Sequence, residues 1–160
     1  MKIVTLAFNV SLITCFLIRA SLFGQTSVNG KDIIGVWKTI DDENGRTKAQ
    51  VEIYKKREKY CGKIVTLLDK QTLINKGKKR FEDIICEECP EEHGKNEKLL
   101  GLEIIWDMTK TPKKHKGGTI MDPADGKTYS CTMWMVDENT LKVRAWLTVF
   151  YRTQTWYRVK

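Results

Sequence analysis

Alternation between apolar and polar residues constrains the fold of this chain more than any other feature of its sequence. Beyond about the first two dozen residues, short alternating segments follow one another, whereas apolar residues at helical spacing are scarce. Successive side chains of a strand point to opposite faces, so a segment with this period buries one face as a β-strand. The pattern predicts an all-β fold whose strands cover residues 33–40, 49–54, 60–66, 99–106, 117–121, 127–135, 140–147 and 151–159.

Most of the expected strands are joined by short turns. Asn44-Gly45 is a strong hairpin signal, because a tight turn between antiparallel strands needs residues that tolerate positive φ. Pro123 and the pair Asp125-Gly126 mark a turn between two further alternating segments. About eight strands joined in this way suit a sandwich or a single antiparallel meander barrel. Residues 67–98 lack strand periodicity, so we expect one long loop excursion there, with room for a short helix.

The amino-terminal segment reads as a cleavable secretory signal. Lys2 provides a charged start, residues 3–18 form an apolar run, and small or polar residues follow. The run is shorter than the roughly 20 residues that a membrane-spanning helix needs, and Arg19 interrupts it. We expect cleavage just before Gln25 and a mature protein in the periplasm or outside the cell.

Two alternatives to simple cleavage are less favoured. The segment could be retained as an amino-terminal anchor, since a charged start followed by an apolar run is also compatible with an anchor. Cys15 follows Leu12, Ile13 and Thr14, an order that distantly resembles a lipidation box. Thr14 is bulky where such a box wants a small residue, and the apolar run continues beyond the cysteine, so lipidation ranks below cleavage.

Removal of residues 1–24 leaves a domain of residues 25–160. This length, about 135 residues, allows one domain with a modest single core. The whole chain carries 28 Lys and Arg against 20 Asp and Glu, a net charge of +8. Lys2 and Arg19 leave with the signal, so the exported domain stays basic at about +6.

Basic residues gather in residues 76–80 and 110–116, both of which lack apolar periodicity. By charge alone, the first cluster could dock on an anionic envelope surface such as lipid A, anionic lipid or polyanionic glycan. The simpler interpretation is a solvated loop. Nucleic acid is not an expected partner, because neither cluster interleaves aromatic residues that would stack bases. The docking residues of the first cluster would be Lys76, Lys78, Lys79 and Arg80.

Export makes disulfides possible, and four cysteines remain after cleavage. They are Cys61, Cys86, Cys89 and Cys131, and three full pairings exist. We favour a local disulfide between Cys86 and Cys89, which would shape a loop rather than secure the fold. Cys61 and Cys131 both fall in expected strands, where they could pair or act as small buried hydrophobes.

Metal binding and redox chemistry at Cys86 and Cys89 are weaker alternatives. A structural zinc needs two more ligands, from His93 or the distant cysteines, and no second C-x-x-C motif is present. A redox thiol wants positive neighbours that stabilise the thiolate, whereas Glu87 and Glu88 lie between these two. We therefore expect neither a metal nor a cofactor.

No catalytic residues are predicted. The two histidines that could act as bases, His93 and His115, lie in charged segments without a serine or cysteine in a recognisable nucleophile setting. No phosphate-binding loop of the usual form occurs. Paired carboxylates remain conceivable among the acidic residues of strands and turns. The sequence thus leans away from an enzyme without settling the question.

A barrel of about eight strands can hold a small ligand in its interior or fill that interior with side chains. Trp106, Trp134 and Trp146 fall in expected strands and are the predicted ligand-pocket residues. They could equally complete a solid core.

Two resemblances sharpen this expectation. Gly35-Val36-Trp37 in the first strand, with Arg158 in the last, resembles the calycin pattern. That resemblance implies a structural base plug in which the Arg158 guanidinium covers the Trp37 indole. The chain also resembles a bacterial family of exported domains of unknown function, number 2147, and this implies a calycin-like, or lipocalin-like, barrel without a known activity. The matching blocks are residues 34–42, 50–54, 60–64, 99–104, 117–123, 126–129 and 152–156.

The resulting hypothesis is an exported calycin-like barrel that binds a small apolar or amphipathic ligand in the cell envelope. A non-enzymatic interaction or scaffold domain, using its basic loops or outer face, is the alternative. An enzyme of unrecognised type is the third possibility.

Export makes a direct prediction. Protein recovered from the producing cell should begin at or near Gln25, because the signal is removed during translocation. Amino-terminal sequencing or intact mass measurement checks this. A protein that retains Lys2, or one that is lipidated at Cys15, would contradict it.

Overall fold

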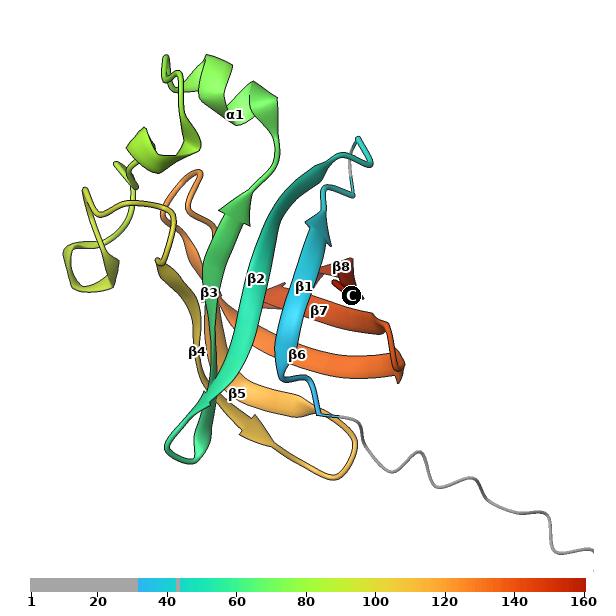
Figure 1. Cartoon of the computed structure of the whole chain (residues 1–160). Coiled ribbons are helices and arrows are strands. Elements are labelled where there is room, and N and C mark those ends of the chain that lie inside the picture. Colours follow the sequence, from blue (N-terminus) through green and yellow to red (C-terminus); the bar gives the residue numbers. More distant parts are fainter. Residues whose placement is uncertain (1–31, 43) are drawn as a thin grey trace, which may run out of the picture.

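The chain forms a closed antiparallel β-barrel of consecutive strands, shown in Figure 1. This computed structural model describes residues 32–42 and 44–160, so the predicted signal and its cleavage site lie outside the described residues. None of the described helices is long and apolar enough to cross a membrane. The strands of the described part are β1 (Gly35–Ile40), β2 (Thr47–Lys56), β3 (Lys59–Leu67), β4 (Glu103–Lys110), β5 (His115–Met121), β6 (Thr128–Asp137), β7 (Thr140–Leu147) and β8 (Phe150–Arg158).

Each strand pairs with the next one along the chain, and β8 returns to pair with β1. The prediction of an all-β meander barrel of about eight strands is therefore confirmed. The turn at Asn44-Gly45 forms as expected: the Gly45 amide donates to the Asp41 carbonyl at 2.7 Å, and Gly45 has a φ of 70°. Positive φ favours glycine, which explains why this position carries one.

The interior of the barrel is lined by the apolar residues of the alternating pattern. Facing residues in neighbouring strands share one face, so Leu141 on β7 lies opposite Trp156 on β8, and Met133 on β6 lies opposite Val143. All four side chains are buried. Burial of these faces provides the main driving force for folding. The most deeply buried side chains include Trp37, Ile53, Ile105, Met108, Met121, Met133, Leu141 and Trp156.

The seam between β1 and β8 is short. Only Trp37 with Arg158 and Lys38 with Tyr157 are register partners there. Further along, the Arg152 side chain spans the seam to Asp42, and its Nε donates to Asp42 Oδ2 at 2.8 Å. This hydrogen bond with Arg152 holds the pKa of Asp42 below its usual range. The contact between Arg152 and Asp42 thus adds a side-chain link to a seam in which the backbones of β1 and β8 pair at only two positions.

Arg158 and Trp37 seal the base of the barrel. The guanidinium carbon of Arg158 lies 4.2 Å from the centre of the Trp37 ring. Its nitrogens donate to the carbonyl oxygens of Ile34 at 2.9 Å, Asp32 at 3.1 Å and Glu138 at 2.8 Å. The fork geometry of arginine lets one side chain bind three carbonyls while its flat face covers the indole.

Gly35 is required beside this seal. Its φ is 134°, and a Cβ at this position would lie 2.6 Å from Arg158 Nη1. Both the backbone conformation and the lack of space exclude a larger residue. The indole of Trp37 in turn donates from Nε1 to the Ile33 carbonyl at 2.7 Å, so the buried ring leaves no unsatisfied donor.

The long excursion between β3 and β4 covers one side of the barrel (Figure 1). It contains the helix α1 (Lys70–Asn75) and two 3-10 turns, η1 (Phe81–Asp83) and η2 (Glu91–His93). The expected strand at residues 99–106 begins only at Glu103. The apolar side chains of Leu99 and Leu102 instead belong to the core beneath the excursion. Buried loop residues of this kind are as apolar as strand residues, so the pattern placed the start of the strand too early.

Cys86 and Cys89 form a disulfide within the excursion, with their Cα atoms 5.5 Å apart. The Cys86 amide donates to the Glu97 carbonyl at 2.8 Å, so the bridged loop is also tied to the segment that returns towards β4. Cys61 on β3 and Cys131 on β6 are buried free thiols. Their strands are not neighbours in the sheet.

The seal predicts a large effect of Arg158→Lys. A lysine cannot bind three carbonyls with a planar fork, so we expect the free energy of unfolding to fall by about 2–3 kcal/mol. Urea denaturation measures this. The matched control is Arg80→Lys, whose exposed, solvent-screened pair with Asp83 should contribute little to stability. Equal effects of the two substitutions would contradict the sealing role.

Candidate functional site

The predicted pocket tryptophans do not line the barrel interior. On β6, Trp134 is the register partner of Lys142, while the neighbouring Met133 points inwards and is buried. Trp146 is the partner of Ser130 on one side and Tyr151 on the other. The two side chains therefore lie on the outer face of the sheet. Both faces of these strands carry large apolar residues, so alternation alone did not specify the face.

The interior at the base of the barrel, next to the contact between Trp37 and Arg158, is occupied by protein side chains instead. Trp37 and Trp156 enter from β1 and β8, and Met108, Met133 and Leu141 pack with them as fully buried members of one core cluster. Methionine adapts to irregular gaps, so it suits a tapering barrel end. The base of the barrel is thus a packed core rather than a ligand cavity.

A small polar cluster is embedded at this base. The Tyr60 hydroxyl donates to Asp32 Oδ2 at 3.2 Å, and the Tyr60 ring meets the His115 ring edge-on with centroids 4.5 Å apart. His115 Nε2 and Asp32 Oδ1 are buried without a hydrogen-bond partner among the described residues. Burial lowers the pKa of His115, Asp32 raises it in part, and Lys110 lowers it further. The imidazole is therefore held in its neutral form.

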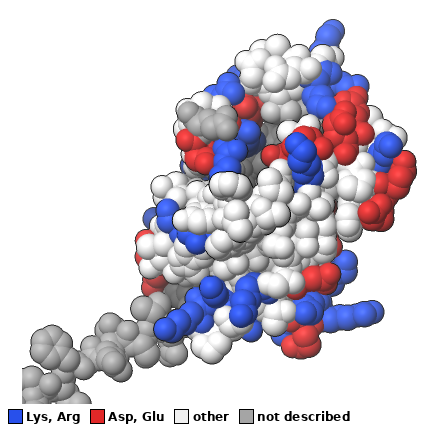
Figure 2. Space-filling model, turned by 180° about the vertical axis from the view of Figure 1, so that it is seen from behind, with Lys and Arg blue, Asp and Glu red and all other residues white. Residues whose placement is uncertain are grey.

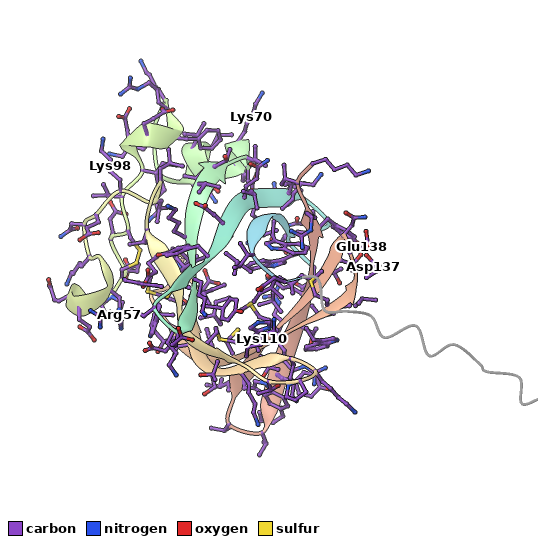
Figure 3. The ribbon with its side chains drawn as sticks, turned by 60° about the horizontal axis from the view of Figure 1, so that its bottom comes forward. Arg57, Lys70, Lys98, Lys110, Asp137 and Glu138 are labelled. Atoms are coloured by element: carbon purple, nitrogen blue, oxygen red, sulfur yellow. A yellow bond between two sulfur atoms is a disulfide. The ribbon has the colours of Figure 1, made fainter. Side chains whose placement is uncertain are left out.

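The structure forms a groove on the outside of the barrel, with a volume of about 630 Å³. One side is the β2–β3 hairpin, which contributes Lys56, Arg57 and Lys59. The floor comes from β3 and β4, and residues 92–97 of the excursion form the opposite side. Figure 3 shows Arg57 at this hairpin, on the side of the molecule that carries the excursion.

An aromatic wall runs along the groove. The rings of His93 and Trp106 are stacked, with centroids 4.2 Å apart and an interplanar angle of 26°. Leu102 adds apolar surface, and Gly94 permits its close approach, since a Cβ there would lie 2.3 Å from Leu102 Cδ1. Trp106, one of the predicted pocket residues, thus lines this groove from the outer face of the barrel.

The polar groups of the floor are largely satisfied. The Tyr54 hydroxyl donates to Glu103, and Lys56 Nζ lies 3.4 Å from the same carboxylate. Burial and the hydrogen bond to Glu103 raise the pKa of Tyr54, so its hydroxyl keeps its proton. Burial also raises the pKa of the Cys61 thiol. A protonated thiol is a poor nucleophile, which argues against cysteine chemistry in the groove.

The rim of the groove carries charges that are free to meet a ligand. Among the described residues, the Arg57 side chain has no ion pair or hydrogen bond, and the carboxylates of Glu92 and Asp107 have no ion pair. Arg57 and Asp107 also have positive φ angles of 55° and 60°. Arg57 stands in the two-residue turn between β2 and β3, a kind of turn that itself calls for positive φ.

The basic cluster of the excursion is partly neutralised by its neighbours. Lys76 Nζ lies 2.7 Å from Glu87, and an Arg80 nitrogen lies 2.8 Å from Asp83. On the face seen in Figure 2, basic and acidic side chains are mixed over the upper part of the molecule. Lys78 and Lys79 therefore remain the cations of this cluster without an ion pair among the described residues.

The two histidines lie in different surroundings. His93 is part of the groove wall, and His115 is buried at the base of the barrel. Within residues 32–42 and 44–160, no three His, Cys, Asp or Glu side chains gather in a way that could hold a metal ion. The pairing of His93 with Trp106 was not foreseen from the sequence. No local signal marks it, because the excursion and β4 meet only after folding.

A closed eight-stranded meander with a Trp–Arg seal at its base is a lipocalin-like barrel. A similar solved structure is the protein HP1028 from Helicobacter pylori, described as a member of the lipocalin family. The two share 19% sequence identity and a TM-score of 0.65, over 81% of this chain and 84% of the other. At this identity the likeness shows the fold.

The chain belongs to the family DUF2147, uncharacterized proteins conserved in bacteria, whose model matches residues 35–158. The match spans the barrel from β1 to β8 and confirms the resemblance found in the sequence. No curated protein matches the chain significantly.

The buried imidazole predicts an acid-sensitive fold. The pKa of His115 is lowered in the folded state, so the unfolded chain binds a proton at pH values where the folded protein does not. Stability is therefore complete above about pH 6.5 and decreases as the pH falls below it. His115→Phe keeps a ring beside Tyr60 and should remove this part of the pH dependence.

Urea denaturation between about pH 5 and pH 7.5 measures the effect. His93→Phe is the matched control and should retain the wild-type pH dependence, because it leaves His115 in place. If His115→Phe showed the same slope as the wild type, another group would be responsible.

Proposed function

We propose that this protein is an exported, lipocalin-fold binding protein that holds a small amphipathic ligand in the groove beside β3 and β4. The observation that carries the proposal is the stacked pair of His93 and Trp106 along a cavity of about 630 Å³. Cavities of a few hundred cubic ångströms with aromatic walls and a few polar groups are typical of small-molecule sites.

The lining suggests how such a ligand would lie. A flat apolar part would cover the exposed face of Trp106 and reach Leu102. An anionic group would lie at Arg57, whose guanidinium has no carboxylate partner within the part of the chain that the structure describes. Lys59 supports the same side, although its ammonium also donates to Thr109 Oγ1 at 2.8 Å. A planar, weakly acidic amphiphile fits this arrangement best.

Export is part of the proposal. The disulfide between Cys86 and Cys89 suits an oxidising compartment, and the amino-terminal residues have the order of a secretory signal. The bridged loop leads into the segment that carries His93, so oxidation would help to shape one side of the groove. A ligand of the cell envelope is consistent with both features.

A fluorescent amphiphile tests the groove. Anilinonaphthalene sulfonate combines flat rings with an anionic group, and its emission increases when it leaves water. We expect Trp106→Leu to weaken its binding about tenfold, because it removes the ring that the dye stacks on. Arg57→Gln should weaken binding several-fold, because it removes the cation that faces the sulfonate. Fluorescence titration measures both.

Trp134→Leu is the matched control, because it removes an indole from the outer face of another part of the barrel. It should leave the Arg57-dependent binding unchanged. Binding that is insensitive to Trp106→Leu would move the ligand out of the groove and overturn the proposal.

A further inference from the structure

The turn between β7 and β8 exposes apolar side chains to solvent. Val149 is 80% exposed, Phe150 is 73% exposed and Leu147 is 59% exposed. Leu147 and Phe150 are register partners next to the turn, and Thr148 between them has a φ of 55°. Exposed apolar side chains gathered at one turn are a feature of interaction surfaces.

Aromatic rings lie directly behind this tip on the outer face. Trp146 and Tyr151 are the adjacent register pair, on the face of the hairpin opposite Leu147 and Phe150, with ring centroids 4.9 Å apart. Arg144 lies two register positions further back on the same face, and its guanidinium carbon is 4.0 Å from the Tyr151 ring centre. It is also 5.4 Å from the centre of Trp146 and 5.1 Å from that of Trp134. The arginine is thus held among three rings.

The hairpin is also free of negative charge. From Thr140 to the end of the chain the sequence has no Asp or Glu. Arg144 donates from Nε to Thr153 Oγ1 at 2.8 Å, and Lys142 donates to Thr155 Oγ1 at 2.6 Å. Both cations are therefore positioned by hydroxyl groups rather than by carboxylates of their own strands. Such a surface is complementary to an anionic one.

We propose that the β7–β8 hairpin docks the protein on a bilayer that contains anionic lipid, with Val149 and Phe150 inserted into the interface. This proposal goes beyond ligand binding in the groove and does not depend on it. Figure 1 shows the barrel to which this hairpin belongs. The tip lies at the end of the barrel opposite the Trp37–Arg158 seal, so docking would leave the base intact.

The order of side chains along the hairpin matches the layers of a membrane surface. A strand rises by about 3.3 Å per residue, so Trp146 lies about 3 Å and Arg144 about 10 Å behind the last strand pair, Leu147 with Phe150. Peripheral segments bury their apolar face by about 5–10 Å. Tryptophan and tyrosine prefer the headgroup level, and cations bind phosphate outside it. A protein partner would require no such ordering.

Vesicle co-sedimentation tests the tip. The protein is used without its predicted signal, starting at Gln25, because the apolar signal would itself bind lipid. We expect it to bind phosphatidylcholine vesicles that contain phosphatidylglycerol more tightly than pure phosphatidylcholine vesicles. The double change Val149→Ser and Phe150→Ser should weaken binding at least about tenfold, and an unchanged melting temperature would show that the variant is folded.

Val136→Ser is the matched control. Val136 is 57% exposed and lies near the β6–β7 turn at the other end of the barrel, so its loss should not change binding. Arg144→Gln should remove most of the preference for phosphatidylglycerol while leaving weak binding to pure phosphatidylcholine. Wild-type binding by the tip variant would overturn the proposal. So would binding that disappears in Lys78→Gln with Lys79→Gln but persists in the tip variant.

A second measurement tests the insertion itself. Tryptophan placed at the tip by Phe150→Trp should be quenched by lipids with brominated acyl chains, whereas Val136→Trp should add no quenched signal. The absence of quenching at the tip would contradict insertion. Vesicle binding that is absent altogether, together with an oligomer that the tip variant dissociates, would assign the tip to a second copy of this chain and overturn the lipid proposal.

Discussion

The contact between Arg158 and Trp37 is the interaction on which the rest of this barrel depends. Backbone pairing between β1 and β8 is limited to two register positions, so the first and last strands need a further tie. Arg158 supplies it by covering the indole and binding carbonyls on both sides of the seam. With the barrel closed at this point, the alternating residues of every strand acquire an inner face to bury and an outer face to expose.

Closure also leaves the base of the barrel packed. Trp37, Trp156 and the surrounding methionines occupy this end of the interior, whereas Trp106 lies on the outer face beside the groove. The excursion supplies the second wall of the resulting groove. Its disulfide and its backbone bonds to the returning segment hold the loop that brings His93 against Trp106. An insertion between two strands thereby forms one wall of a groove on the outside of the barrel.

The groove and the β7–β8 hairpin occupy separate parts of the surface and use different chemistry. The groove combines one aromatic wall with rim charges of both signs. The hairpin combines an apolar tip with aromatic rings and with the cations Lys142 and Arg144, on strands that contain no Asp or Glu. A barrel docked through the hairpin would keep its groove open to solvent. Ligand binding and surface docking are therefore compatible roles for one small domain.

The sequence by itself determined the strand count, the turns at Asn44-Gly45 and residues 122–126, and the family, because side-chain alternation and turn chemistry are local properties. Through the resemblance to calycins, it also predicted the contact between Trp37 and Arg158. Only the tertiary structure decided the faces of Trp134 and Trp146, since their strands carry large apolar residues on both sides and a shift of one residue exchanges them. The later start of β4 and the stacking of His93 on Trp106 likewise depend on contacts between segments that are distant in the chain.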